Sequence, residues 1–226
     1  MPLLPAGAAP YLAPYAAFLA LVELQARVPS AAALLFPLRV VVPAALLAFF
    51  WRRGAYAELR GYRLSAGTLA DIALGLAIAA LWVAPYLLLP SLTRGDAFDP
   101  ALMGESRRAL ALGLRLAGFA LVTPFVEELF VRSFLLRFSE VFDRDGDFRR
   151  EPIARFAWRG FIVTALWFTF SHAPWEWWVA LPTGIALNAW LYWRGRLMAC
   201  VVAHACANAA IWALVVFAPP PLWEFL

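Results

Sequence analysis

The sequence predicts an all-α, polytopic membrane protein: a helical bundle of seven transmembrane helices, with eight as the alternative count. Hydrophobic residues make up 64% of the 226 residues and charged residues only 15%, whereas a soluble domain has about half and about a quarter. Several apolar runs also reach the ~20 residues that cross ~30 Å of hydrocarbon. A cytosolic enzyme, a disordered chain and a disulfide scaffold therefore fit poorly, and we expect residues 1–226 to form a single integral membrane domain.

Apolar runs separated by short polar connections give the expected spans. The run 108–138 is too long for one untilted span, because an α-helix rises ~1.5 Å per residue. Arg115 suggests a division there, with residues 106–114 along the interface. The run 158–173 is short, so it tilts, starts earlier or stops partway. The expected spans are 10–28, 31–51, 67–90, 116–136, 158–173, 176–193 and 197–217.

Arginine placement sets the expected orientation. All 19 basic residues are arginine, and many lie in the connections 52–66, 139–159 and 194–196. Positively charged connections tend to stay in the cytoplasm, so the N-terminus is expected there and residues 218–226 on the far side. Topology thus explains the net charge of +4, and no nucleic-acid partner is expected. The absence of lysine hints at a GC-rich bacterial genome, and hence at the bacterial inner membrane.

Ionisable residues inside spans are the informative ones, because each costs ~2.5–3.5 kcal/mol at the bilayer centre and needs a partner or a task. The fourth span carries Glu127 and Glu128, which diverge by ~100° on a helix and cannot face one point. Arg132 lies four residues after Glu128 and can pair with it. Glu127 is then left for general acid–base chemistry. Alternatively, arginines of other spans hold both carboxylates.

The only two histidines, His172 and His204, both lie in expected spans, and Asn208 follows four residues after His204. A lone histidine in an apolar helix is more often a satisfied interior residue than a catalyst. His204 and Asn208 share a helix face, where they can stabilise an oxyanion or serve as interhelical hydrogen-bonding residues. Their positions permit one layer with Glu127, opening toward the cytoplasmic side.

Together these residues resemble the three motifs of the CAAX protease and bacteriocin-processing superfamily, which includes the type II CAAX prenyl endopeptidases, or Ras-converting enzymes. The similar patterns, within residues of about 110–210, are Glu127-Glu128-x-x-x-Arg132, Phe168-x-x-x-His172 and His204-x-x-x-Asn208. The resemblance implies a glutamate-dependent intramembrane endopeptidase. Its expected substrate is the C-terminal tail of a membrane-associated or lipid-modified protein. Within the family, the compact chain resembles the exosortase- and myxosortase-associated group.

The resemblance also implies a role for each motif residue. Glu127 would be the general base for a water held also by His172. His204 and Asn208 would form the oxyanion hole. Glu128, paired with the arginine four residues later, would brace the first motif. We expect no metal or other cofactor. Zinc is the less favoured alternative, because the chain has no His-Glu-x-x-His pattern and asparagine is a poor zinc ligand.

Arg39 is a further charge, near the middle of the second span. It pairs with Glu23 or another carboxylate, reaches water, or binds the carboxylate of a substrate. Two other function classes stay open beside the endopeptidase. One is a non-catalytic membrane peptide-binding or bacteriocin-immunity protein on the same fold. The other is a small transporter, for which the sequence shows no paired broken helices.

Overall fold

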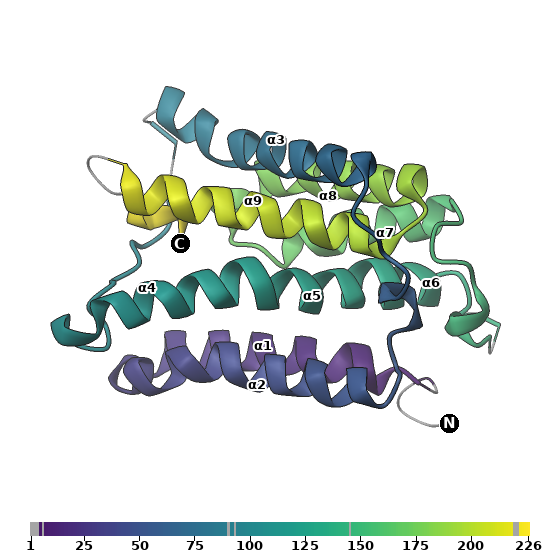
Figure 1. Cartoon of the computed structure of the whole chain (residues 1–226), viewed down its shortest axis with the longest axis horizontal. Helices are drawn as coiled ribbons and strands as arrows, with labels where there is room; N and C mark the ends of the chain where they lie inside the picture. The colour runs from purple at the N-terminus through teal and green to yellow at the C-terminus, as the bar shows by residue number, and fades with distance from the viewer. Residues whose placement is uncertain (1–4, 6, 90, 93, 145, 219–221) are drawn as a thin grey trace.

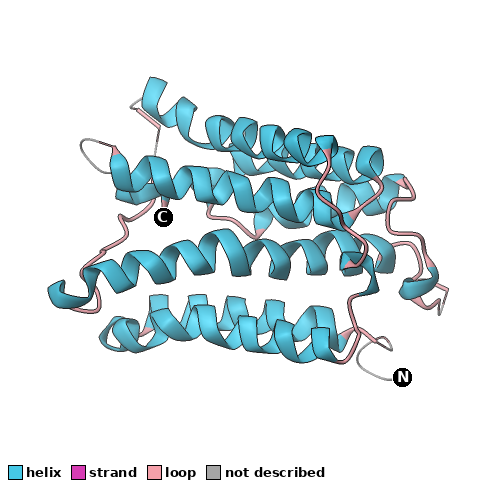
Figure 2. Cartoon of the chain, in the orientation of Figure 1, coloured by secondary structure: helices cyan, strands magenta, loops and turns pink. Residues whose placement is uncertain are grey.

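The computed structural model describes residues 5, 7–89, 91–92, 94–144, 146–218 and 222–226. Throughout these residues the regular structure is helical, without a strand, as Figure 2 shows. Four helical segments in them are long and apolar enough to cross a membrane: 29–52, 66–88, 105–138 and 197–217. The prediction of an all-helical integral membrane protein is confirmed at this level.

The helices run along the long axis of the molecule in three tiers (Figure 1). One tier is an antiparallel pair, a single long helix lies beside it, and the remaining helices pack on the other side of that long helix. The boundaries fall within a few residues of the expected spans. The helices outside the long one are α1 (Ala9–Arg27), α2 (Ala32–Arg52), α3 (Ala66–Leu88), α7 (Trp158–Phe170), α8 (Trp177–Arg194) and α9 (Leu197–Phe217).

The long helix is continuous over 34 residues, or ~50 Å. The predicted division at Arg115 is wrong: the backbone stays helical there, and the guanidinium lies over the rings of Phe98 and Phe119, at 5.8 and 5.0 Å from their centroids. Stacking on the rings accommodates the charge without a break. The segments are α4 (Arg108–Leu116), π-helical η4 (Ala117–Val122), α5 (Thr123–Glu128), π-helical η5 (Leu129–Leu135) and α6 (Leu136–Phe138).

The two π-helical segments change which residues share a face. Four residues overshoot one α-helical turn by ~40°, whereas a π turn, with its i→i+5 bonds, holds more residues per turn. Side chains four residues apart therefore project from nearly the same face of the helix through η4. Four such positions line one cavity in this structure: Arg115, Phe119, Thr123 and Glu127.

Helices α7 and α8 form a hairpin whose turn, residues 171–176, stays inside the bundle. α7 has only 13 residues, ~20 Å of helix. In Figure 1 the hairpin ends well short of the end of the molecule that α3, α4 and α9 reach. Of the three possibilities for the short fifth span, the length of α7 favours the one that stops partway. His172 and Glu176 are thereby brought to the cavity lining.

Close backbone contact joins α3 to α9. A Cβ atom at Gly75 would lie 2.4 Å from the carbonyl oxygen of Ala203 and 2.6 Å from Cβ of Cys206. Small residues at such a contact let two apolar helices approach where no hydrophobic effect drives them together. An ion pair joins α3 to the C-terminal end of α8, where Asp71 Oδ1 lies 2.8 Å from Arg194 Nε.

We predict that Gly75→Ala lowers the free energy of unfolding by about 1–3 kcal/mol, because the added methyl group forces α3 away from α9. The measurement is the unfolding midpoint of the purified chain, followed by tryptophan fluorescence. Gly113→Ala is the matched control, since a Cβ there meets no atom within 4 Å. It should keep the midpoint or raise it. Equal midpoints for both variants would contradict the close packing.

Candidate active site

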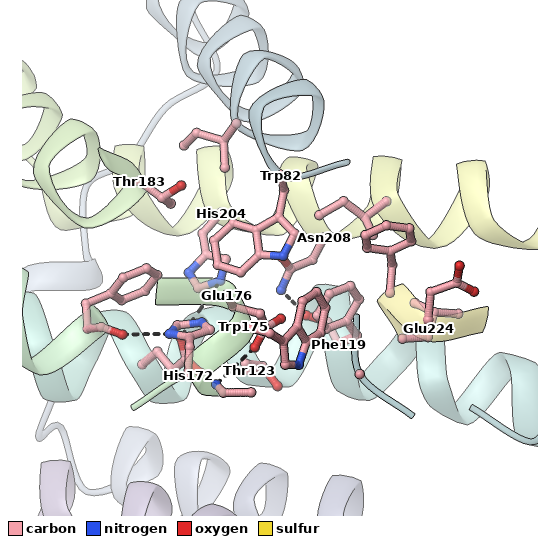
Figure 3. A pocket seen from close by; sticks show the side chains of 18 of the residues that line it. Trp82, Phe119, Thr123, His172, Trp175, Glu176, Thr183, His204, Asn208 and Glu224 are labelled. Carbon is pink, nitrogen blue, oxygen red and sulfur yellow. Dashed lines mark hydrogen bonds and ion pairs between the residues drawn. The ribbon is translucent and has the colours of Figure 1, made fainter. Parts of the chain in front are cut away.

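A cavity of about 320 Å³ lies where the long helix, α3, α9 and the α7–α8 turn meet. Four of the predicted site residues line it: Glu127, His172, His204 and Asn208. Figure 3 shows His172 rising from the turn and His204 and Asn208 descending from α9 toward the same space. The structure thus brings together residues that lie up to 81 positions apart in the sequence.

Behind the cavity lies the buried ion pair of Glu128 and Arg132. Glu128 Oε1 is 3.1 Å from Arg132 Nη1, and both side chains are fully buried. The guanidinium also lies 4.5 Å from the ring centroid of Phe168. The i,i+4 pairing expected from the sequence is present. Neither residue of the pair lines the cavity, but both contact residues that do: Glu128 contacts His204, and Arg132 contacts Phe168.

Asn188 on α8 completes the surroundings of this pair. Its Oδ1 accepts a hydrogen bond from Arg132 Nε (3.2 Å), and its Nδ2 donates to Thr164 Oγ1 (2.9 Å) and to the Phe161 carbonyl (3.2 Å). One side chain therefore joins the long helix, α7 and α8. The sequence reasoning missed Asn188, although an asparagine inside an apolar run was a signal for it.

His204 is oriented by the same carboxylate. Its Nδ1 lies 2.9 Å from Glu128 Oε1, and its Nε2 lies 3.9 Å from Glu127 Oε2. An ionised carboxylate can only accept, so Nδ1 carries the hydrogen. Nε2 then faces Glu127 and the cavity. A neutral ring accepts at Nε2 and a protonated ring donates there, so an oxyanion-hole role requires the imidazolium.

His172 has its tautomer set by a backbone carbonyl. Its Nδ1 lies 2.6 Å from the Phe168 oxygen, which can only accept. The ring packs against Phe168 and Trp82, with centroids 4.6 and 5.3 Å away. In the neutral ring, Nε2 therefore carries a lone pair and can accept a hydrogen bond from a water in the cavity.

Asn208 contacts the π-helical segment. Its Nδ2 donates to the Phe119 carbonyl at 2.7 Å, as the dashed line in Figure 3 marks. This bond uses one of the two amide hydrogens, and the second remains for a ligand. The contact also ties α9 to the stretch of the long helix where the backbone departs from α-helical geometry.

Glu127 is the carboxylate that the cavity exposes. Its side chain is 14% exposed, and its Oε2 is buried without a hydrogen-bond partner among the described residues. The nearest basic group recorded for it is His204 Nε2, at 3.9 Å. A half-buried carboxylate with an unused oxygen can take a proton from a water.

A second carboxylate, Glu176, lines the same cavity and was not among the predicted site residues. Its Oε2 accepts a hydrogen bond from the Ala173 backbone N–H at 3.1 Å, which closes the turn after His172. The signal available in the sequence was an acidic residue between tryptophans directly after the second motif. Because the α7–α8 turn lies inside the bundle, the Glu176 carboxylate reaches the cavity.

The cavity extends toward the end of the molecule opposite the arginine-rich connections. Its remaining lining comes from the α7–α8 turn, the connection that holds Asp96, and the C-terminal residues 224–226. These lining residues lie at the end opposite to the predicted, arginine-rich opening, while Phe168, Thr183 and Leu187 line the cavity from α7 and α8. The hairpin stops short and leaves space on the other side, while the pair of Glu128 and Arg132 fills the bundle on the arginine-rich side.

Of the alternatives for Arg39, the ion pair with Glu23 is not formed in the structure. Glu23 pairs with Arg27 one turn later, at 2.5 Å, because both lie on the exposed face of α1. Arg39 Nη1 instead donates to Gln25 Oε1 at 3.1 Å. Arg39 lines a cavity of about 230 Å³ that Glu127 and His172 also border.

In the described part of the chain, no group of three or more His, Cys, Asp or Glu side chains is placed so that it could hold a metal ion. Glu127 and Glu128 diverge, and the second is already bonded to an arginine and a histidine.

Residues 109–210 match the family model described as Type II CAAX prenyl endopeptidase Rce1-like. The comparisons with curated proteins and with solved structures give no match. The matched range begins in α4 and ends in α9, so it contains all three motifs and leaves out α1 to α3.

We predict that Asn188→Leu lowers the free energy of unfolding by about 1–3 kcal/mol, because Arg132 Nε loses its acceptor inside the bundle. Thr183→Val, also on α8, is the control. The Thr183 hydroxyl is buried without a hydrogen-bond partner among the described residues, so its removal should cost little. Thermal unfolding followed by tryptophan fluorescence measures both. If the two variants unfold alike, the Asn188 network does not stabilise the fold.

Proposed function

Over residues 109–210 the chain belongs to the Rce1-like type II CAAX prenyl endopeptidase family, and from this premise we propose that it is a glutamate-dependent intramembrane endopeptidase. The observation that carries the proposal is that Glu127, His172 and His204 line one cavity, where the Glu127 carboxylate has no arginine partner among the described residues. Its substrate is the C-terminal tail of a membrane-associated or lipid-modified protein.

In the proposed reaction, the Glu127 carboxylate takes a proton from a water that also donates to His172 Nε2. The water oxygen bonds to the carbonyl carbon of the scissile peptide, and the carbonyl oxygen becomes an oxyanion. The C–N bond then breaks, and the amine leaves with the proton that Glu127 held. A positioned general base of this kind contributes about 10²–10⁴-fold to the rate.

The oxyanion is held by His204 Nε2 and by the free N–H of Asn208. Because Glu128 fixes the hydrogen at Nδ1, His204 donates to the oxyanion only in its protonated form. The carboxylates of Glu127 and Glu128 on its two sides complement that charge. A single donor of this type is typically worth about 10²–10³-fold in rate.

The remaining helices fit a single membrane domain. We propose that α1, α7 and α8 lie within the bilayer with the four spans, which gives seven membrane segments, one hairpin of which stops partway. The arginine-rich connections then face the cytoplasm, and the membrane is the bacterial inner membrane. The site accordingly opens to the opposite side.

We predict that Glu127→Gln lowers cleavage of a membrane-tail peptide by at least about 10³-fold, because the amide keeps the shape of the side chain and cannot accept the proton. Mass spectrometry of the products measures cleavage. The control is Glu105→Gln, which changes an exposed carboxylate before α4 and should leave the rate unchanged. Full cleavage by Glu127→Gln would exclude Glu127 as the base, and retained peptide binding without any turnover in the native chain would indicate a non-catalytic binding protein.

Glu176→Gln separates the two carboxylates of the cavity. Its oxygen is already bonded to the backbone N–H of Ala173, so we predict at most about a tenfold loss of kcat, the cost of one weakened hydrogen bond. The same peptide assay measures it, beside Glu127→Gln. A loss at Glu176 equal to that expected at Glu127, with Glu127→Gln active, would assign the base to Glu176.

A further inference from the structure

Two arginines inside the bundle differ from all the others. Most arginines are exposed, and six are buried or half-buried. Four of these six have a carboxylate partner within salt-bridge distance, while Arg39 and Arg115 have none among the described residues. The four pairs are Arg94 with Glu224, Arg132 with Glu128 (3.1 Å), Arg137 with Glu58 (3.4 Å) and Arg194 with Asp71 (2.8 Å).

The guanidinium groups of Arg39 and Arg115 keep most of their donors unused. Each carries five N–H groups. Arg39 makes one side-chain hydrogen bond, to Gln25 at 3.1 Å. Arg115 makes none in the described part of the chain, and its Nε is fully enclosed without an acceptor. Its other contacts are with the faces of two phenylalanine rings. A positive charge without a carboxylate partner is costly inside an apolar bundle, and a bound anion would reduce this cost.

Both arginines face the same space. They line the cavity of about 230 Å³ between α2 and the long helix, and a neighbouring cavity of about 600 Å³. Gly118 makes this possible: a Cβ there would lie 2.8 Å from Cγ2 of Val40, so α2 approaches the long helix directly beside Arg39. Two guanidinium groups from different helices thereby border one cavity.

The same cavity reaches the proposed catalytic residues. Glu127 and His172 line it together with the two arginines, and Arg115 also lines the cavity of about 320 Å³ that holds His204 and Asn208. Arg115 precedes Glu127 by twelve residues, ~18 Å along the helix. Allowing for the reach of both side chains, about three to five extended residues at ~3.3 Å each bridge this distance.

Three of the carboxylates nearby are engaged elsewhere. Glu176 accepts from the Ala173 N–H, Glu224 pairs with Arg94, and Asp99 Oδ1 accepts from the Ala101 N–H. Asp96 and the C-terminal residue Leu226 also line cavities with Arg115, and neither forms an ion pair with Arg39 or Arg115 in the described part of the chain. The protein thus supplies hydrogen-bond donors at one end of the connected cavities and a base at the other, with room for a short peptide between them.

We propose that Arg39 and Arg115 bind the free C-terminal carboxylate of the substrate. This rests on the proposed endopeptidase function and adds a site that measures the distance from the chain end to the scissile bond. A planar carboxylate matches the forked guanidinium, and two guanidinium groups can share its four lone-pair positions. A peptide that runs along the line from Glu127 to Arg115 places its terminus there.

The test compares two fluorescent, S-farnesylated peptides that are identical except at the C-terminus, one a free acid and one an amide, each ending in Cys-Val-Val-Ser. Binding is measured by fluorescence anisotropy to the full chain carrying Glu127→Gln, in phosphatidylcholine nanodiscs. The acid should bind about 10–100-fold more tightly, the range for hydrogen bonds to a charged group. Equal affinities, or no binding of either peptide, would overturn the proposal without any arginine variant.

Arginine variants then locate the effect. Arg39→Gln with Arg115→Gln should abolish the preference for the acid, while Arg155→Gln, at an exposed arginine, should keep it. A preference that survives the double variant contradicts the assignment. If phosphatidylglycerol in the nanodisc competes with both peptides alike, and the acid has no advantage, then the arginines hold a lipid phosphate and the proposal fails.

The outcome is separable from that of the proposed function. If the native chain cleaves neither peptide but prefers the acid in binding, only the endopeptidase proposal fails. If the native chain cleaves acid and amide with equal kcat/KM, the endopeptidase proposal stands and the carboxylate site is refuted.

Discussion

The carboxylate of Glu128 is the group on which the site depends. One of its oxygens lies 3.1 Å from Arg132 and 2.9 Å from His204, so a single buried atom ties the long helix to α9. Arg132 extends the contact to Asn188 and the Phe168 ring, and thus to α8 and α7. Removing one partner of such a buried pair typically costs about 3–5 kcal/mol, because the other charge is left without water. The cavity keeps its shape through this pair.

Adjacency in the sequence gives the two glutamates different tasks. Neighbouring helix positions point ~100° apart, so the helix that directs Glu128 into the packed interior directs Glu127 into the cavity. Each carboxylate keeps one buried oxygen without a hydrogen-bond partner among the described residues, but Glu128 Oε1 contacts both Arg132 and His204, whereas Glu127 has only His204 Nε2 at 3.9 Å. One charge is therefore used for structure, and the other remains reactive.

Sequence periodicity and local spacing predicted much of this arrangement. The helix positions and the pair of Glu128 with Arg132 follow from apolar runs and from i,i+4 geometry, while the grouping of Glu127, His172, His204 and Asn208 into one site was implied by the resemblance to the family motifs. Spacing could not predict contacts between distant segments. Asn188 and Glu176 acquire their places only when α7 and α8 fold into the bundle. Arg115 was expected to end a helix, because nothing local shows that Phe98 and Phe119 supply rings for its charge. The direction of the cavity likewise depends on where the hairpin stops.

The rule that a charge in an apolar bundle requires a partner also identifies its exceptions. Arg94, Arg132, Arg137 and Arg194 obey it with carboxylates of this chain. The groups that do not obey it, Glu127 and the two unpaired arginines, all border the same connected cavities. They have opposite charge: Glu127 and Arg115 lie at opposite ends of one stretch of the long helix, and Arg39 borders the same cavity from α2. A peptide end has the complementary arrangement: an amide carbonyl to be hydrolysed, and a carboxylate a few residues away. The partners missing from the fold are thus those that a substrate tail would supply.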